Sequence, residues 1–167
     1  MNETVLVAYG STNGSTAEIA ERVGEVLSKE GLTVDVRSAA RVADVTPYGA
    51  VVLGGGLYAG RWQRDARRFA RRHRKALAER PVWLFSSGPL DPSASERDIP
   101  PAPGVRRVVN RTDARGHITF GGRLEGEVKG RVARMIVNSG KGGDFRDFEQ
   151  IAAWAATVAH DLRGPDV

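Results

Sequence analysis

Short runs of apolar residues alternate along the chain with segments of helical periodicity, which predicts strands alternating with helices. Runs typical of strands buried on both faces of a parallel sheet lie at residues 5–8, 50–53 and 82–85. A further strand is expected at residues 117–120. Between residues 32 and 37, apolar and polar residues alternate, so this strand is expected at a less buried edge of the sheet.

Helical spacing of apolar residues predicts a first helix over residues 15–30, a second over 61–80 and a last helix near the carboxyl end. Asp144 and Asp147 resemble a capping pair that opens the last helix. Strands that alternate with helices predict a doubly wound α/β sandwich. A length of 167 residues suits a single domain over residues 1–167.

The first buried strand ends in a loop whose composition predicts phosphate binding. The loop consists of small hydroxyl, amide and glycine residues from Ser11 to Thr16. A helix follows, and a helix N-terminus offers free N–H groups and a partial positive charge. The spacing matches neither a dinucleotide fingerprint nor a nucleoside-triphosphate loop, so a monophosphate is the expected ligand. In the alternative interpretation, Ser15 or Thr16 only caps the helix.

Two more loops of small residues follow the third and fourth strands, and the three loops are expected to form one site. Ligands of open parallel sheets bind beyond the carboxyl ends of the strands, where the strand order reverses. The second loop, expected to be flexible from Gly54 onward, brings Tyr58 and Trp62 near the site. Tyr58 is interpreted as a ring contact or as a solvent-facing residue, and Trp62 as a ring contact or as core. The third loop, 86–90, lacks an aromatic residue, so one ring face is open or is covered by Leu90 or the long loop 91–104.

The amino-acid composition limits the reactions that the side chains can carry out by themselves. The chain has no cysteine, so disulfides and thiolate chemistry are excluded and a redox role requires a bound cofactor.

We expect a cytoplasmic protein, because there is no room for a signal peptide before the first strand and no apolar run long enough for a membrane span. His73, His117 and His160 belong to no recognisable constellation, so no catalytic acid or base and no metal site is assigned.

A net charge of +5 indicates an anionic partner, and the charge is concentrated on the predicted helix 61–80. Its cations are Arg61, Arg64, Arg67, Arg68, Arg71, Arg72, Arg74, Lys75 and Arg80. Three interpretations remain: a solvated face, docking of an anionic small molecule, or peripheral binding to the inner face of the cell membrane. Nucleic acid is disfavoured because no binding module or interleaved aromatic platform accompanies the charge.

The loop from Ser11 to Thr16 resembles the Ser/Thr-x-Thr-Gly-x-Thr phosphate loop of flavodoxins, with Asn13 in place of the middle threonine. The resemblance implies FMN as the cofactor and a flavodoxin-like, three-layer fold with five parallel strands in the order 2-1-3-4-5. The residues expected to bind FMN are Ser11, Thr12, Asn13, Gly14, Ser15, Thr16, Leu57, Tyr58, Ala59, Gly60, Trp62, Ser86, Ser87, Gly88 and Leu90.

A narrower resemblance runs through almost the whole chain. Gly60-Arg61-Trp62, Phe69, Arg71-Arg72-His73, Gly142-Gly143-Asp144 and Asp147-Phe148-Glu149-Gln150 are similar to menaquinone-dependent protoporphyrinogen dehydrogenase. The resemblance implies an FMN oxidoreductase of haem biosynthesis that moves hydrogen from a porphyrinogen-like donor to a quinone. The family's insertion before the last helix is shorter and less aromatic here; its apolar residues Leu124, Val128, Val132, Met135 and Ile136 suit either packing or membrane engagement.

The second functional class left open is a flavodoxin-type electron carrier that serves a protein partner. The basic surface favours the enzyme, because carrier flavodoxins are typically acidic and dock on basic partners. A domain that has lost its cofactor is disfavoured by the intact hydroxyl-rich loop at residues 11–16.

Overall fold

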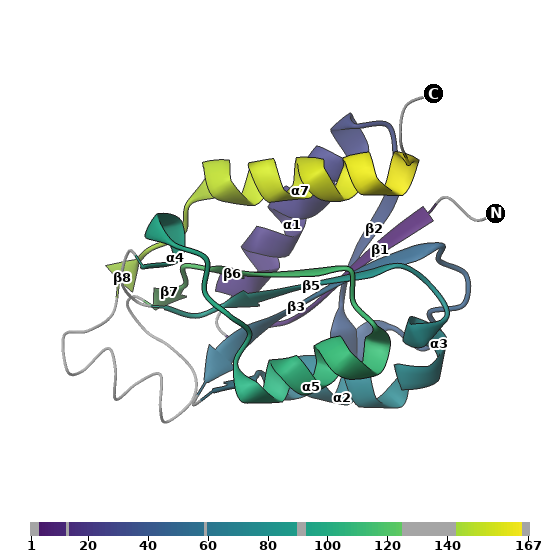
Figure 1. The fold of residues 1–167 in the computed structure, drawn as a ribbon, viewed down its shortest axis with the longest axis horizontal. Helices are drawn as coiled ribbons and strands as arrows, with labels where there is room; N and C mark the ends of the chain where they lie inside the picture. Colours follow the sequence, from purple (N-terminus) through teal and green to yellow (C-terminus); the bar gives the residue numbers. More distant parts are fainter. Residues whose placement is uncertain (1–3, 13, 59, 90–92, 125–142, 165–167) are drawn as a thin grey trace.

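The computed structural model describes residues 4–12, 14–58, 60–89, 93–124 and 143–164. Its central sheet contains the parallel strands β1 (Thr4–Gly10), β2 (Thr33–Ser38), β3 (Ala50–Tyr58), β5 (Val82–Ser87) and β6 (Gly116–Phe120). The strand order is β2-β1-β3-β5-β6 (Figure 1). A short strand β4 (Arg61–Trp62) pairs antiparallel with the end of β3. Counting the parallel strands alone, this confirms the predicted order 2-1-3-4-5.

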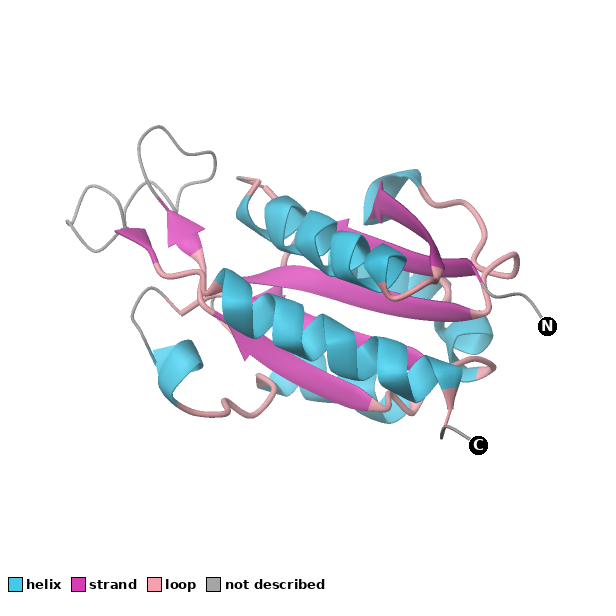
Figure 2. Cartoon of the chain, turned by 90° about the horizontal axis from the view of Figure 1, so that it is seen from above, coloured by secondary structure: helices cyan, strands magenta, loops and turns pink. Residues whose placement is uncertain are grey.

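Helices cover both faces of the sheet and complete three layers. Helices α1 (Ser15–Lys29) and α7 (Phe148–Arg163) lie side by side on one face (Figures 1 and 2). The other face carries α2 (Arg64–Arg72), α3 (Arg74–Ala78), α5 (Pro103–Thr112) and the 3₁₀ turn η1 (Ala39–Arg41). Near the carboxyl ends of the strands lie the short helix α4 (Ser93–Glu96) and a two-stranded ribbon, β7 (Arg123–Leu124) with β8 (Gly143–Asp144).

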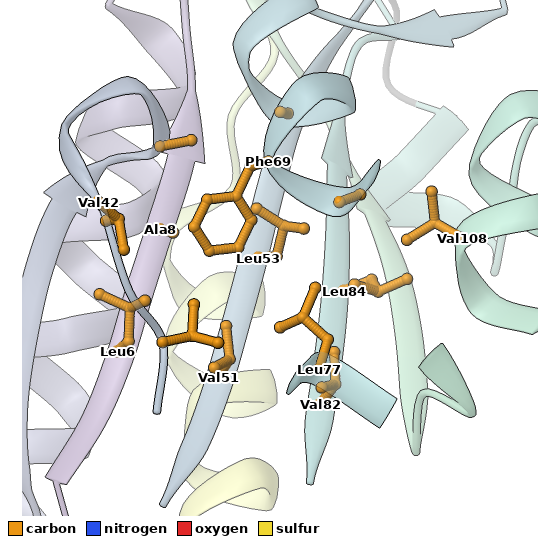
Figure 3. Close-up of a cluster of buried hydrophobic side chains, with 14 of the residues drawn as sticks. Leu6, Ala8, Val42, Val51, Leu53, Phe69, Leu77, Val82, Leu84 and Val108 are labelled. Carbon is orange, nitrogen blue, oxygen red and sulfur yellow. The ribbon is translucent and has the colours of Figure 1, made fainter. Parts of the chain in front are cut away.

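The strand side chains divide between two cores. Leu6, Leu53 and Leu84 belong to the core on the α2 face, where Phe69 lies beside Leu53 and Leu84 lies beside Leu77 (Figure 3). On the opposite face, Phe85 and Phe120 pack beneath α1 and α7. Complete burial of one such side chain is worth roughly 1.5–3 kcal/mol, so the central strands are held from both sides. Strand β2 lies at the edge of the sheet with only partly buried residues, as its alternating pattern predicted.

Strand β3 is longer than predicted, because Gly54, Gly55 and Gly56 belong to the strand and not to a flexible loop. The reason is close packing. A Cβ at Gly54 would overlap the Phe85 ring, and one at Gly55 would stand 2.6 Å from Trp62 Cγ. The glycines therefore make room for rings on either face of the sheet, a tertiary requirement that no local pattern reveals.

The predicted helix over residues 61–80 is divided. Its first two residues form β4, Gln63 caps α2 by accepting a hydrogen bond from the Asp65 N–H at 2.7 Å, and His73 separates α2 from α3. The long loop predicted over residues 91–104 contains α4, and its end is the start of α5. Pro103 begins α5, where its fixed φ is compatible with a first helical turn.

Of the predicted capping pair, one aspartate caps the last helix. Asp147 accepts a hydrogen bond from the Gln150 N–H at 3.1 Å at the start of α7. Asp144 lies in β8 and binds the guanidinium of Arg146 instead. Most of the segment that carries Val128, Val132, Met135 and Ile136 falls outside the described residues, so the choice between packing and membrane engagement stays a prediction.

We predict that Gly54→Ala destabilises the protein by about 1–3 kcal/mol, the usual cost of overpacking a core. The new methyl group would overlap the Phe85 ring. Urea unfolding of the wild type, Gly54→Ala, Phe85→Leu and the double variant tests this as a cycle. The penalty for Gly54→Ala should shrink in the Phe85→Leu background. An equal penalty in both backgrounds would show that the ring is not what excludes a side chain at residue 54.

Candidate functional site

The loop between β1 and α1 is closed by its own side chains and leaves the start of the helix uncapped. Ser11 Oγ accepts a hydrogen bond from the Gly14 N–H at 2.9 Å. Gly14 is the N-cap residue of α1, with a left-handed φ of 86° that favours glycine, and no side chain caps the helix there. The interpretation of Ser15 or Thr16 as caps is therefore wrong. Asn13 lies outside the described residues, and Thr12 is exposed.

Thr16 places a hydroxyl at the mouth of the site. Its side chain is only 3% exposed, and no hydrogen bond joins its Oγ1 to another residue in the part of the chain that the structure describes. A Cβ at Gly56 would stand 3.1 Å from Thr16 Oγ1 and 3.5 Å from Tyr58 Cε2. The end of β3, the first turn of α1 and the Tyr58 ring thus meet at one point, where a side chain at residue 56 would intrude.

The second predicted loop is a β-hairpin. Tyr58 pairs with Arg61 and Leu57 with Trp62, and Gly60 adopts a φ of 76° at the turn. Leu57 packs against the third loop, because a Cβ at Gly88 would stand 2.8 Å from Leu57 Cβ. Tyr58 is half-buried beside Thr16, and its contact with a cofactor ring stays a prediction. Ala59 lies outside the described residues.

The third loop begins later than predicted, since Ser86 and Ser87 are the last, fully paired residues of β5. Gly88 follows and donates its N–H to the Phe120 carbonyl at 3.1 Å. Gly122, after β6, packs on Gly88. The loops that follow β1, β3, β5 and β6 therefore converge at the carboxyl edge of the sheet, as expected for a single site. Leu90 lies outside the described residues.

Trp62 belongs to the core, as the second of its two interpretations predicted. Its side chain is 2% exposed, and its Nε1–H donates to Ser86 Oγ at 2.9 Å. Ser86 Oγ lies 3.0 Å from Nε2 of His117. Because Ser86 accepts from Trp62, its own proton is free to be donated to His117 Nε2. This polar chain fastens the β3–β4 hairpin to β5 and β6 beneath the site.

Burial sets the charge of His117. Desolvation lowers the pKa of His117 from 6.5 to about 4, against a smaller opposing effect of the Asp98 carboxylate. The imidazole is therefore neutral near pH 7 and can accept the Ser86 proton at Nε2. Burial also lowers the pKa of His73, which packs on the Phe69 ring at 4.6 Å, whereas His160 is exposed. His73, His117 and His160 lie on different elements of the fold.

A fourth segment, not predicted, fastens the start of α1. The Arg123 N–H donates to Ser15 Oγ at 3.2 Å, and the Arg123 guanidinium lies 3.3 Å from Glu18. Arg146 binds Glu18 at 2.8 Å and Asp144 at 2.9 Å, and its hydrogen bond lowers the pKa of Asp144. Two arginines thus balance the carboxylate of Glu18 near the anion-binding end of α1. The available sequence signal was Gly121-Gly122, a pair of small residues directly after a strand.

The residues present fit a phosphate-bearing cofactor. The uncapped first turn of α1 and the Thr16 hydroxyl provide donors, and Gly56 leaves room for a ligand to approach. Among the residues described, no three metal-binding side chains cluster. The described helices include none that is both long and apolar enough to cross a membrane.

Comparisons with known proteins agree with this geometry. Residues 6–145 match a family model described as a flavodoxin domain. A flavodoxin from Pseudomonas aeruginosa, solved as a point mutant, is 18% identical with a TM-score of 0.65, and the match covers 96% of this chain and 99% of that one. Oxidised flavodoxin 2 from Bacillus cereus is 18% identical with a TM-score of 0.63, and the match covers 93% and 97%. A search of curated proteins found no match.

A larger protein contains a domain of the same fold. Rubredoxin oxygen:oxidoreductase from the anaerobe Desulfovibrio gigas is 14% identical with a TM-score of 0.64. The match covers 96% of this chain but 36% of that protein. Identities at this level describe a shared fold.

We predict that the partly buried His117 makes stability depend on pH. Between about pH 4 and 6.5, the unfolded chain binds a proton at His117 that the folded protein does not, so stability falls as the pH is lowered. Between pH 7 and 4.5 the loss should be about 2 kcal/mol. Denaturant unfolding at both pH values should show this loss of stability in the wild type and in the exposed control His160→Gln. The loss should be absent in His117→Gln. An equal pH dependence in all three proteins would contradict the assignment.

Proposed function

The chain belongs to the flavodoxin family, and from this we propose that it is an FMN-dependent oxidoreductase that moves hydrogen from a porphyrinogen-like donor to a quinone. FMN as the cofactor follows from the family. The observation that supports an enzyme is the dense positive charge beside the β3–β4 hairpin, which suits a donor bearing carboxylates. The described carriers of this charge include Arg61 in the hairpin and Arg67 and Arg71 in α2.

The chain's own residues would hold FMN by its phosphate and by its ring. The N–H groups at the start of α1 and the hydroxyl of Thr16 would bind the phosphate, with Gly56 leaving space for it. Tyr58 would offer an aromatic contact to the ring, worth roughly 0.5–1.5 kcal/mol beyond area burial. Bound FMN supplies the hydride and electron chemistry, and the protein supplies position and electrostatics.

The buried residues beneath the hairpin would keep this arrangement rigid. The hydrogen bond from Trp62 to Ser86 ties the hairpin to β5, so Tyr58 is held at a constant distance from the phosphate loop. Positioning of this kind matters because donor and acceptor atoms must approach within about 3–3.5 Å for hydride transfer. We assign no acid or base, since none of the three histidines lies on the loops that converge.

An electron carrier that serves a protein partner is the second candidate. The site would bind FMN equally well in that case, and the family match alone does not separate the two functions. The sign of the surface charge favours the enzyme, because a basic carrier would need an acidic partner. The exposed Arg64, Arg68 and Arg72 of α2 would also attract an anionic membrane surface, where a quinone is found.

We predict that Thr16→Ala weakens FMN binding about ten- to a hundredfold, the usual effect of losing one hydrogen bond to a charged group. Fluorescence titration of FMN into the FMN-free protein measures the dissociation constant. Thr157→Ala is the matched control, because Thr157 is exposed and its hydroxyl bonds only the Trp154 carbonyl within α7 among the described residues. Unchanged FMN affinity in Thr16→Ala would show that Thr16 does not bind the phosphate and would contradict the assignment of the phosphate to this loop.

The proposed reaction predicts turnover without a protein partner. Under anaerobic conditions, protoporphyrinogen should reduce the protein-bound FMN, and a menaquinone analogue should reoxidise it, both at rates well above those of free FMN at equal concentration. Absorbance of the bound flavin reports each half-reaction. A carrier would bind FMN with the same affinity but would be reduced only by a partner reductase. Failure of both half-reactions with fully loaded protein would exclude the proposed donor and acceptor.

A further inference from the structure

A groove lined by arginines lies between α2, α5 and β4, away from the phosphate loop. It has a volume of about 300 Å³. The arginines come from three elements: Arg61 from β4, Arg67 and Arg71 from α2, and Arg107 and Arg111 from α5. Small residues, including Ala70 and Gly104, line the groove with them. The volume is at the lower end of the range of small-molecule sites.

No carboxylate in the described part of the chain balances this charge. Among the described residues, none that lines the groove is acidic, and none of the five arginines forms an ion pair with a described Asp or Glu. Arg123, Arg146 and Arg163, by contrast, are each paired with an acidic residue. Five like charges around one hollow repel each other, and an anion in the groove would relieve that repulsion.

A hydrogen bond holds Arg67, one of the five groove arginines, in position. The Nε–H of Arg67 donates to the Trp62 carbonyl at 2.9 Å, which orients its terminal nitrogens and leaves them without another described acceptor. The pairing of β4 with β3 fixes the backbone of Arg61 opposite Tyr58, and its side chain is exposed. Gly104 of α5 lies beside Arg61, since a Cβ there would stand 3.4 Å from Arg61 Cγ, an ordinary contact distance. Arginines fixed in this way can bind oxyanions bidentately at a smaller entropic cost.

Arg107 and Arg111 complete the groove from the opposite side. They are four residues apart on α5 and therefore share a helix face, with Val108 buried beside them. Neither residue belongs to the basic segment 61–80, so the two groups of arginines meet only through the packing of α5 on β4 and α3. The charges consequently surround a hollow, whereas a flat membrane surface would contact projecting side chains.

The geometry points to a binding site for a small molecule that bears two or more carboxylate or phosphate groups. Two groups are required because the arginines stand on opposite walls of the groove, on α2 and on α5. Either oxyanion matches the guanidinium fork. The site is separate from the FMN loop, but Arg61, Arg67 and Arg71 also carry the charge from which the carboxylate-bearing donor is proposed, so this inference deepens the proposed function and rests in part on it.

Direct binding to the FMN-loaded protein tests the site. Isothermal titration calorimetry at a constant ionic strength of about 0.1 M would compare citrate and inorganic pyrophosphate, with acetate as the monovalent control. We expect saturable one-to-one binding of at least one multivalent anion and none of acetate. The comparison of citrate with pyrophosphate identifies which oxyanion the groove prefers.

Two double variants separate the groove from general charge. Arg107→Gln/Arg111→Gln removes two charges from the groove, and Arg64→Gln/Arg106→Gln removes two exposed charges from the same helices, α2 and α5, outside it. The groove variant should bind the anion about ten- to a hundredfold more weakly, and the control should stay within about twofold of the wild type. Arg107→Lys/Arg111→Lys, which keeps the charge but loses the fork, should fall between them.

Three results would overturn the proposal. The first is equal weakening in the groove and control variants, which would mean unspecific attraction. The second is the absence of saturable binding of both multivalent anions. The third is binding to vesicles of phosphatidylserine and phosphatidylcholine that depends on Arg107 and Arg111 while no small anion binds, which would make the surface a lipid contact. None of these measurements requires turnover, so their outcome is independent of the proposed enzyme activity.

Discussion

Close packing on both faces of β3 is the constraint on which the site depends. Gly54 accommodates the Phe85 ring on the face of α1 and α7, and Gly55 accommodates Trp62 on the face of α2. Gly56 then leaves space beside Thr16 and Tyr58. Side chains at these positions would push the hairpin and α1 away from the sheet. Three consecutive residues of β3 therefore face a core phenylalanine, a core tryptophan and the mouth of the site in turn.

Two kinds of polar contact stabilise the edge that this packing creates. Beneath the sheet, Ser86 joins Trp62 to His117, and burial keeps that histidine neutral, so the chain of hydrogen bonds carries no net charge. Above it, Glu18 is balanced by the arginines of the β7–β8 region. A carboxylate in the first turn of α1 would otherwise repel a bound phosphate. The anion-binding end of α1 therefore retains its positive potential.

Much of this architecture could be predicted because it is recorded locally in the sequence. The apolar runs at 5–8 and 82–85 identify central strands, and the small, hydroxyl-rich residues 11–16 identify the loop that leads into α1. Features that arise from tertiary packing could not be predicted. The local pattern of Gly54–Gly56 predicts a loop, because a ring packed from a neighbouring strand leaves no local signal. The α5 helix begins within a Pro-rich stretch, and Arg107 joins the other groove arginines only through packing.

The β7–β8 ribbon has a consequence for how the fold can diversify. Its two strands pair at Arg123 with Asp144 and at Leu124 with Gly143, which closes the chain between them at its base. Lengthening a segment whose ends are already joined costs little, roughly 0.6 kcal/mol for each doubling of its length. Related chains could therefore exchange this segment for longer or shorter ones while the phosphate loop keeps its supports. The ribbon is a natural junction for grafting a new recognition element next to the start of α1.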